Sequence, residues 1–192
     1  MRKTILAIAL ASVMGGTAMA VTLPAGDSKN NPLTGVTAAS DATLAGTVVQ
    51  DSSTPFGGKG INGTIQVRVV KSKKTAGFHY YWRISNAPAS KGAINTLNVH
   101  SWPGMTAYEV EYRIDGMGNA RPLTVSRYHN ALDSNPKEKL INFYFDPKLA
   151  IPPGQSSKWF FIKTSAKTSS QVNLSIYGTP GFIANVTGLG PK

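Results

Sequence analysis

The stretch Ala76-Gly-Phe-His-Tyr-Tyr-Trp-Arg-Ile-Ser-Asn86 decides the fold, because it carries the most aromatic mass of the chain and alternates cleanly. One face holds Phe78, Tyr80, Trp82 and Ile84, and the opposite face holds His79, Tyr81, Arg83 and Ser85. A period of two is typical of a β-strand with one buried face. We therefore expect a central strand that buries its first face and offers His79, Tyr81 and Arg83 as candidate partner contacts.

The same alternation continues along the chain on both sides of this stretch. Residues 65–69 and 107–115 alternate apolar and polar side chains, and turn-forming Gly, Pro, Asn and Ser separate such segments. No run of ten or more residues shows a capped helix with an apolar face. About nine short strands joined by turns predict an all-β fold, either an antiparallel β-sandwich or a jelly roll.

The first twenty residues have the pattern of a bacterial secretory signal peptide. Arg2 and Lys3 precede an apolar run over residues 5–14, and the segment closes with Ala18-Met-Ala20. A basic start, a short apolar middle and a small-residue end are what a signal peptidase recognises. The sequence predicts removal of residues 1–20 and export to the periplasm or the extracellular space, with no later run long enough to span a membrane.

The composition of the remaining chain divides it into three parts. Residues 21–41 are rich in Pro, Gly, Asn, Ser and Thr without periodicity, and we expect a flexible N-terminal arm there. Residues 42–187 carry the strand patterns and predict one β-sandwich domain, and residues 188–192 are expected to form a C-terminal tail. The length suits a single domain with its own core. The oligomeric state stays open.

Charge and cysteine content limit the classes of partner and chemistry. Lysine and arginine total 20 against 9 acidic residues, which gives a formal net charge of +11. These cations are dispersed, so they favour attraction to a polysaccharide or an anionic cell-surface polymer over a nucleic-acid function. Cysteine is absent, which excludes disulfides, thiol chemistry and cysteine-based zinc sites.

Three segments together resemble a family of exported bacterial proteins. They are Phe78-His-Tyr-Tyr-Trp-Arg-Ile-Ser-Asn86, Ala107-Tyr-Glu-Val-Glu-Tyr-Arg-Ile-Asp115 and Ile151-Pro-Pro-Gly-Gln-Ser-Ser-Lys-Trp-Phe-Phe-Ile-Lys-Thr164. In order and spacing they are similar to the single β-sandwich domain of PEP-CTERM-associated proteins, a family of uncharacterised function. The resemblance implies a fold and export but no catalytic residues. This chain ends in Gly188-Leu-Gly-Pro-Lys192 without the Pro-Glu-Pro sorting signal, so anchoring by that route is not expected.

Two carboxylates form the strongest candidate for catalysis. Glu109 and Glu111 lie two residues apart on one predicted strand and therefore share a face. Glycoside hydrolases use such a pair of carboxylates, so one interpretation is a carbohydrate-active jelly-roll enzyme. The other interpretation is the solvated face of an amphipathic strand with Arg113 as a partner, and the alternation favours it.

The remaining polar and aromatic candidates each have a plain structural interpretation. His79, His100 and His129 are scattered, so no metal or cofactor site is predicted. Asp115-Gly-Met-Gly-Asn119 has oxygen donors for calcium, yet its chemistry is typical of a turn. Trp102 is a candidate partner contact next to a Pro-Gly pair, although packing is favoured. The sequence thus favours a non-catalytic binding, structural or surface-associated module, with the hydrolase as its alternative.

Overall fold

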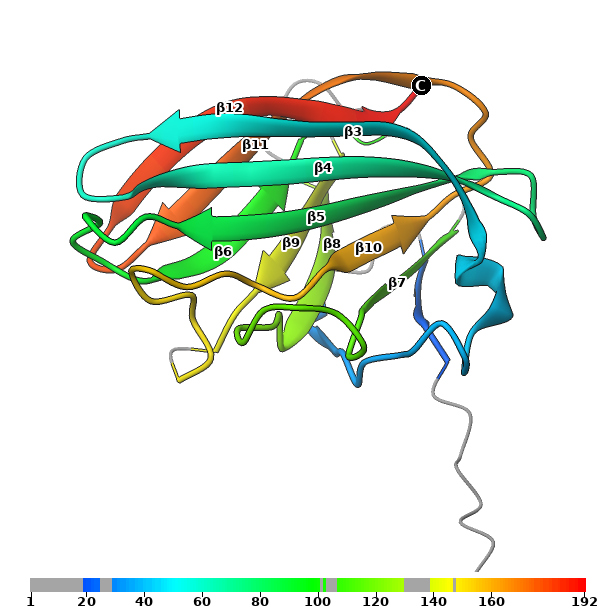
Figure 1. The fold of residues 1–192 in the computed structure, drawn as a ribbon, viewed down its shortest axis with the longest axis horizontal. Coiled ribbons are helices and arrows are strands. Elements are labelled where there is room, and N and C mark those ends of the chain that lie inside the picture. Colours follow the sequence, from blue (N-terminus) through cyan, green and yellow to red (C-terminus); the bar gives the residue numbers. More distant parts are fainter. Residues whose placement is uncertain (1–18, 25–28, 101, 103–106, 130–138, 147) are drawn as a thin grey trace, which may run out of the picture.

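The computed structural model describes residues 19–24, 29–100, 102, 107–129, 139–146 and 148–192. Two antiparallel sheets of six strands each face one another, so the predicted all-β sandwich is confirmed (Figure 1). The described residues form twelve strands rather than about nine, and one short 3-10 helix. Two of the additional strands come from the segment that precedes residue 42.

The first sheet contains the aromatic strand near its centre. The strand order is β1, β7, β10, β5, β4, β3, with antiparallel pairing throughout. The strands are β1 (Val21–Pro24), β7 (Ala107–Tyr112), β10 (Phe160–Lys163), β5 (Phe78–Asn86), β4 (Asn62–Ser72) and β3 (Gly46–Gly57). The predicted central strand is β5, and β10 and β4 flank it.

The second sheet covers the inner face of the first. Its order is β12, β11, β6, β9, β8, β2, again with antiparallel pairing. The strands are β12 (Phe182–Pro191), β11 (Ser169–Gly178), β6 (Ile94–Val99), β9 (Lys139–Tyr144), β8 (Thr124–His129) and β2 (Asn31–Pro32). At one side of the sandwich β12 comes close to β3, as Figure 1 shows.

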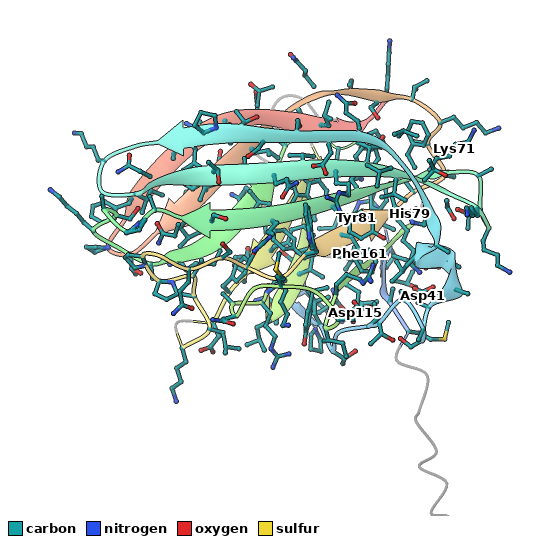
Figure 2. The ribbon with its side chains drawn as sticks, viewed as in Figure 1. Asp41, Lys71, His79, Tyr81, Asp115 and Phe161 are labelled. Atoms are coloured by element: carbon teal, nitrogen blue, oxygen red, sulfur yellow. The ribbon has the colours of Figure 1, made fainter. Side chains whose placement is uncertain are left out.

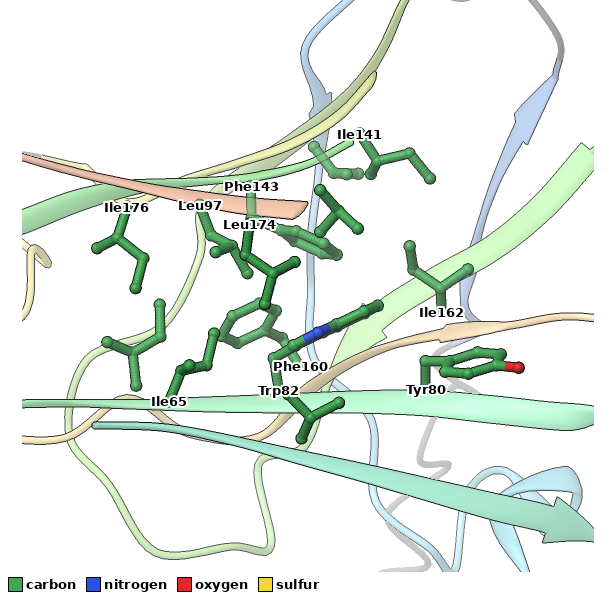
Figure 3. Close-up of a cluster of buried hydrophobic side chains, with 14 of the residues drawn as sticks. Ile65, Tyr80, Trp82, Leu97, Ile141, Phe143, Phe160, Ile162, Leu174 and Ile176 are labelled. Atoms are coloured by element: carbon green, nitrogen blue, oxygen red, sulfur yellow. The ribbon is translucent and has the colours of Figure 1, made fainter. Parts of the chain in front are cut away.

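Aromatic side chains pack against one another in the core between the sheets. Trp82 is fully buried, and its ring lies 6.2 Å from that of Phe160, 6.0 Å from Phe143 and 5.8 Å from Trp102. Figure 3 shows Trp82, Phe143 and Phe160 with apolar residues of both sheets around them. Burial of such rings supplies much of the driving force for folding a domain without disulfides. The expectation that Trp102 packs is confirmed, and this residue is not available as a partner contact.

The segment 21–41 differs from the flexible arm that its composition indicates. Its strand β1 pairs with β7 in the first sheet, and β2 pairs with β8 in the second. Leu23 and Leu33 are buried in the core between the sheets, which ties the segment down. The expected tail over 188–192 is also ordered, because β12 continues to Pro191 opposite Ser169.

The predicted signal peptide lies outside the described residues, apart from Met19 and Ala20. In the part of the chain that the structure describes, no helix combines the length and apolar character needed to cross a membrane. Export therefore remains a prediction from the sequence of residues 1–20.

Residues 33–45, which we call the strap, connect the second sheet to the outer face of the first. The strap passes the edge of β7, where the backbone of Val36 hydrogen-bonds to Tyr112 and Ile114. It ends in the 3-10 helix η1 (Ala42–Leu44), whose N-cap is Asp41. Val36 and Leu44 pack with Val70, Tyr81 and Phe161 in a second, smaller apolar cluster. The outer face of the first sheet is therefore partly covered.

Candidate functional site

Strand register places the predicted outward residues of β5 and β7 on one common face. His79 pairs with Lys163 of β10, and Lys163 pairs in turn with Glu109 of β7. One step along the strands, Tyr81 pairs with Phe161, and Phe161 with Glu111. Figure 2 shows His79, Tyr81 and Phe161 together on this face. The structure thus assembles candidate residues that lie far apart in the sequence, and two hollows open on the same face.

The arginine hollow, which we define by Arg68, Tyr81, Arg113 and Trp159, has a volume of about 250 Å³. Arg68 donates from Nε and Nη2 to Oδ2 of Asp51, at 2.9 and 2.6 Å. Its guanidinium also lies over the Trp159 ring, 4.8 Å from the centroid. Contacts on two sides hold this cation in a fixed orientation.

Arg113 is oriented by a second aspartate. Its Nε and Nη2 donate to the two carboxylate oxygens of Asp115 at 2.6 and 2.8 Å, and the backbone N–H of Ala38 donates to the same carboxylate at 2.9 Å. The guanidinium lowers the pKa of Asp115 to about 2, whereas Asp115 raises the pKa of Arg113. Because Ala38 belongs to the strap, this ion pair also fastens the strap beside the hollow.

Tyr81 contributes a buried hydroxyl to the arginine hollow. The residue is 4% exposed, and its buried hydroxyl lies close to the guanidinium of Arg113 without a hydrogen bond of regular geometry to any described residue. Burial raises the pKa of Tyr81 to about 12, although the nearby Arg113 opposes this shift. The phenol therefore stays protonated at neutral pH and can donate a hydrogen bond to a ligand.

The lysine hollow, which we define by His79, Glu109 and Lys163, has a volume of about 330 Å³. The ammonium of Lys163 lies between two carboxylates, because Nζ donates to Oδ2 of Asp41 and, at 2.9 Å, to Oε2 of Glu109. Burial raises the pKa of Asp41, but hydrogen bonds from Lys163 and Thr43 outweigh it, so the net shift is downward. Asp41 connects the strap to β10 through this contact.

His79 lies against the lysine hollow and is 1% exposed. Burial lowers the pKa of its imidazole to about 4, and the ammonium of Lys163 adds to the shift, while Asp41 and Glu109 oppose it. The ring is therefore neutral at neutral pH. Its Nε2 lies 3.5 Å from Oγ1 of Thr75, whereas Nδ1 is buried without a partner among the described residues. His79 is not a freely exposed contact.

Glu109 and Glu111 share the outer face, as the spacing predicts, but they do not share a cleft. Glu111 is fully buried, and its Oε2 accepts hydrogen bonds from the backbone and hydroxyl of Thr34, at 3.1 and 3.2 Å. Glu109 is bound to Lys163 and its side chain is 53% exposed. A hydrolytic pair must reach one substrate together. Here Thr34 of the strap binds Glu111, whereas Glu109 lines the lysine hollow.

The other candidates lie in structural roles or outside the site. Arg83 is half-buried on the outer face, and its Nε has no partner among the described residues. Nε2 of His100 lies 2.9 Å from the hydroxyl of Ser175, on the second sheet. Across the described ranges, no group of three or more His, Asp or Glu side chains is arranged to hold a metal ion. The side chain of His129 lies outside the described residues.

Sequence reasoning did not single out Arg68, Arg113 or Trp159 as a group, and it did not pair Asp41 with Lys163. One signal was available, since Trp159, Phe161 and Lys163 alternate and must share a face of their segment. The strand register that brings this face beside Tyr81 and His79 is a property of the folded sheet.

None of the known protein-family models matches the sequence, and no curated protein is significantly similar to it. The resemblance to the PEP-CTERM-associated type stays a prediction. The geometry of the outer face is therefore the basis for a proposed function.

Proposed function

We propose that the protein is an exported, non-catalytic binding module that holds an acidic polysaccharide at the arginine hollow. The observation that carries this proposal is the convergence of Arg68, Arg113 and the hydroxyl of Tyr81 around one hollow of about 250 Å³. These groups are hydrogen-bond donors under neutral conditions, and the two guanidinium groups also carry positive charge. A donor-rich hollow suits a carboxylate or sulfate group.

The aspartates that pair with Arg68 and Arg113 orient the two guanidinium groups but do not use all of their N–H donors. Asp51 accepts hydrogen bonds from Nε and Nη2 of Arg68, and Asp115 accepts hydrogen bonds from the same two nitrogens of Arg113. The Nη1 group of each guanidinium carries two further N–H donors for an anionic ligand. Preorganised donors bind more tightly than mobile ones, because less side-chain entropy is lost when the ligand arrives.

The surroundings favour one residue of a polymer over an isolated small molecule. The volume falls just below the range of roughly 300–1,000 Å³ that is usual for small-molecule pockets. Leu44, Val48 and Trp159 supply apolar wall, against which the C–H face of a sugar ring can pack. A polymer presents many equivalent acidic residues to one such hollow, which raises their local concentration.

The overall charge of the protein supports the same class of ligand. Removal of residues 1–20 takes away Arg2 and Lys3, so 18 basic and 9 acidic residues remain and the net charge is +9. This charge attracts a polyanion over long distances and raises the rate of encounter. This attraction is screened by salt, whereas oriented contacts inside a hollow are screened less. Export through residues 1–20 would bring the module to the polysaccharides of a cell surface.

Binding to immobilised polygalacturonate and to neutral dextran, at low and at high salt, tests the proposal. We expect binding to the acidic polymer that persists in part at high salt, and little binding to dextran. Replacing Arg68 and Arg113 together with alanine should weaken binding at least about tenfold, since each charge-assisted contact contributes roughly 1.5–3 kcal/mol.

A matched control removes the same charge elsewhere. Lys167 and Lys192 are exposed and line neither hollow, so the double alanine variant at these positions should bind nearly as well as the wild type. Equal weakening in both double variants would show that only net charge is sensed and would contradict a site in the arginine hollow. Circular dichroism of both variants checks that the fold is kept.

A further inference from the structure

The lysine hollow contains an amine and a carboxylate that are held together and largely shielded from water. The side chains of Lys163 and Asp41 are 9% and 10% exposed, and Nζ of Lys163 contacts Oδ2 of Asp41. The two residues lie 122 positions apart in the sequence, so only folding brings them together. Lys163 belongs to β10 and Asp41 to the strap.

The carboxylate of Asp41 is oriented so that its two oxygens have different surroundings. Oδ1 accepts hydrogen bonds from the backbone N–H of Thr43 at 3.0 Å and from its hydroxyl at 2.5 Å. Oδ2 faces the amine of Lys163. Two donors on one oxygen polarise the carbonyl and can stabilise negative charge that develops there. The other oxygen is placed as a leaving group.

Glu109 provides a second carboxylate on the same amine. Its Oε2 lies 2.9 Å from Nζ of Lys163, within the distance needed for proton transfer. Its side chain is about half exposed, so it can exchange protons with solvent. The imidazole of His79 is neutral and adds no charge to the group at neutral pH. The hollow thus brings together a nucleophile in Lys163, an oriented carboxyl group in Asp41 and a proton carrier in Glu109.

We propose that Lys163 and Asp41 condense into an intramolecular amide, with Glu109 as the proton carrier. A proton passes from the ammonium through Glu109 to Oδ2, which leaves a neutral amine and a carboxylic acid. Nζ then attacks Cγ of Asp41, while Thr43 holds Oδ1. A second proton moves from Nζ to Oδ2, the Cγ–Oδ2 bond breaks, and one water molecule leaves. One N–C bond forms, and no oxidant or further reactant is consumed.

Proximity explains how an amine and a carboxylate can condense without activation by a cofactor. Well-oriented groups within one molecule reach effective concentrations of about 10⁵–10⁸ M, which offsets much of the barrier. The released water leaves a site that is already largely closed to solvent. The reaction depends on the folded state, because β5, β7, β10 and the strap must first assemble the hollow.

The amide would staple the strap to the first sheet of a chain that has no cysteine. The strap supplies Leu44 to the outer apolar cluster and Ala38 to the ion pair of Arg113 and Asp115. A covalent link across 122 positions limits the unfolded chain in the way that a disulfide does. Exported domains with small cores commonly rely on disulfides for this purpose.

Mass spectrometry of the purified wild-type protein under denaturing conditions tests the proposal directly. We expect a mass that is lower by one water molecule than the mass of the same processed chain without the amide. Trypsin should then release a branched peptide that joins residues 30–59 to residues 159–167, with Lys163 left uncleaved. The full mass, together with cleavage after Lys163, would overturn the proposal.

Three variants identify the role of each group. Lys163→Arg keeps the charge but cannot form the amide, so it should show the full mass. Asp41→Asn should lose ammonia instead of water.

Glu109→Gln should lower the cross-linked fraction after a fixed time at least about tenfold, since a positioned proton carrier contributes about 10²–10⁴ in rate. Undiminished cross-linking in Glu109→Gln would overturn the role of Glu109. None of these residues lines the arginine hollow, so polysaccharide binding is tested independently.

Discussion

The two faces of β5 use alternate residues of one strand for different purposes. Tyr80, Trp82 and Ile84 point between the sheets into an apolar core. Their neighbours His79 and Tyr81 point outward and are also buried, but among ionisable groups and beneath the strap. The inner face accounts for the stability of the fold, whereas the outer face holds the groups that can bind or react. Substitutions on the two faces should therefore have separable effects.

The largest expected difference concerns the aromatic residues of the two clusters. Trp82→Ala should destabilise the protein by about 3–5 kcal/mol, because a large cavity opens between the sheets. Phe161→Ala should cost less, about 2 kcal/mol, because the small outer cluster lies next to a hollow and can relax or admit water. Urea unfolding followed by circular dichroism measures both. A greater loss in Phe161→Ala would reverse the assignment of the main core.

The next largest effect is a pH dependence that originates at His79. Its pKa falls from 6.5 to about 4 on folding, so between these values the unfolded chain binds more protons than the folded one. Stability from this residue is complete above pH 6.5 and is lost as the pH falls towards 4. The shift corresponds to roughly 3 kcal/mol over that window.

Urea unfolding of the wild type and of His79→Gln at several pH values between 4 and 7 checks this expectation. The variant lacks the titrating ring, so its stability should vary less with pH in this window. Parallel curves for the two proteins would show that His79 is solvated and titrates normally. Asp41, Glu109 and Lys163, which face the ring, are unchanged in both proteins.

The smallest expected effect separates two neighbouring tyrosines. The hydroxyl of Tyr80 donates to the carbonyl of Thr168 at 3.2 Å and lies 3.1 Å from the hydroxyl of Ser169, so Tyr80→Phe should cost about 1 kcal/mol. Tyr81→Phe removes a hydroxyl that lies close to Arg113 but makes no hydrogen bond of regular geometry, so it should cost less stability than Tyr80→Phe. The same change should weaken binding of the acidic polymer several-fold. Thermal melting and the binding assay together distinguish the two positions.

Sequence patterns predicted the class of fold and the faces of the main strands. The alternation in residues 76–86 and 107–115 is local, so the inward positions of Trp82 and Tyr112 could be read directly. The composition of residues 21–41 indicates a flexible arm, because Leu23 and Leu33 are isolated apolar residues among prolines and glycines, without a period. Their burial depends on pairing with distant strands. Such pairing is set by the whole sheet and not by the segment itself.

The candidate site was predictable only in part for the same reason. The spacing of Glu109 and Glu111 correctly places them on one face, but it cannot show that the strap buries Glu111 through Thr34. Nor does any local pattern bring Arg68 over Trp159 or Asp41 beside Lys163. These contacts join residues that are 91 and 122 positions apart. They follow from strand register and from the path of the strap.

The most direct test of the central claim is an NMR titration of the protein with an acidic oligosaccharide such as trigalacturonate. We predict that chemical-shift changes concentrate at the indole N–H of Trp159, at Arg68, Tyr81 and Arg113, and at the adjoining end of the strap. A trisaccharide of neutral sugars should leave these signals unchanged. Changes spread over the dispersed lysines, with none in the arginine hollow, would contradict the claim that the outer face of the first sheet is the binding site.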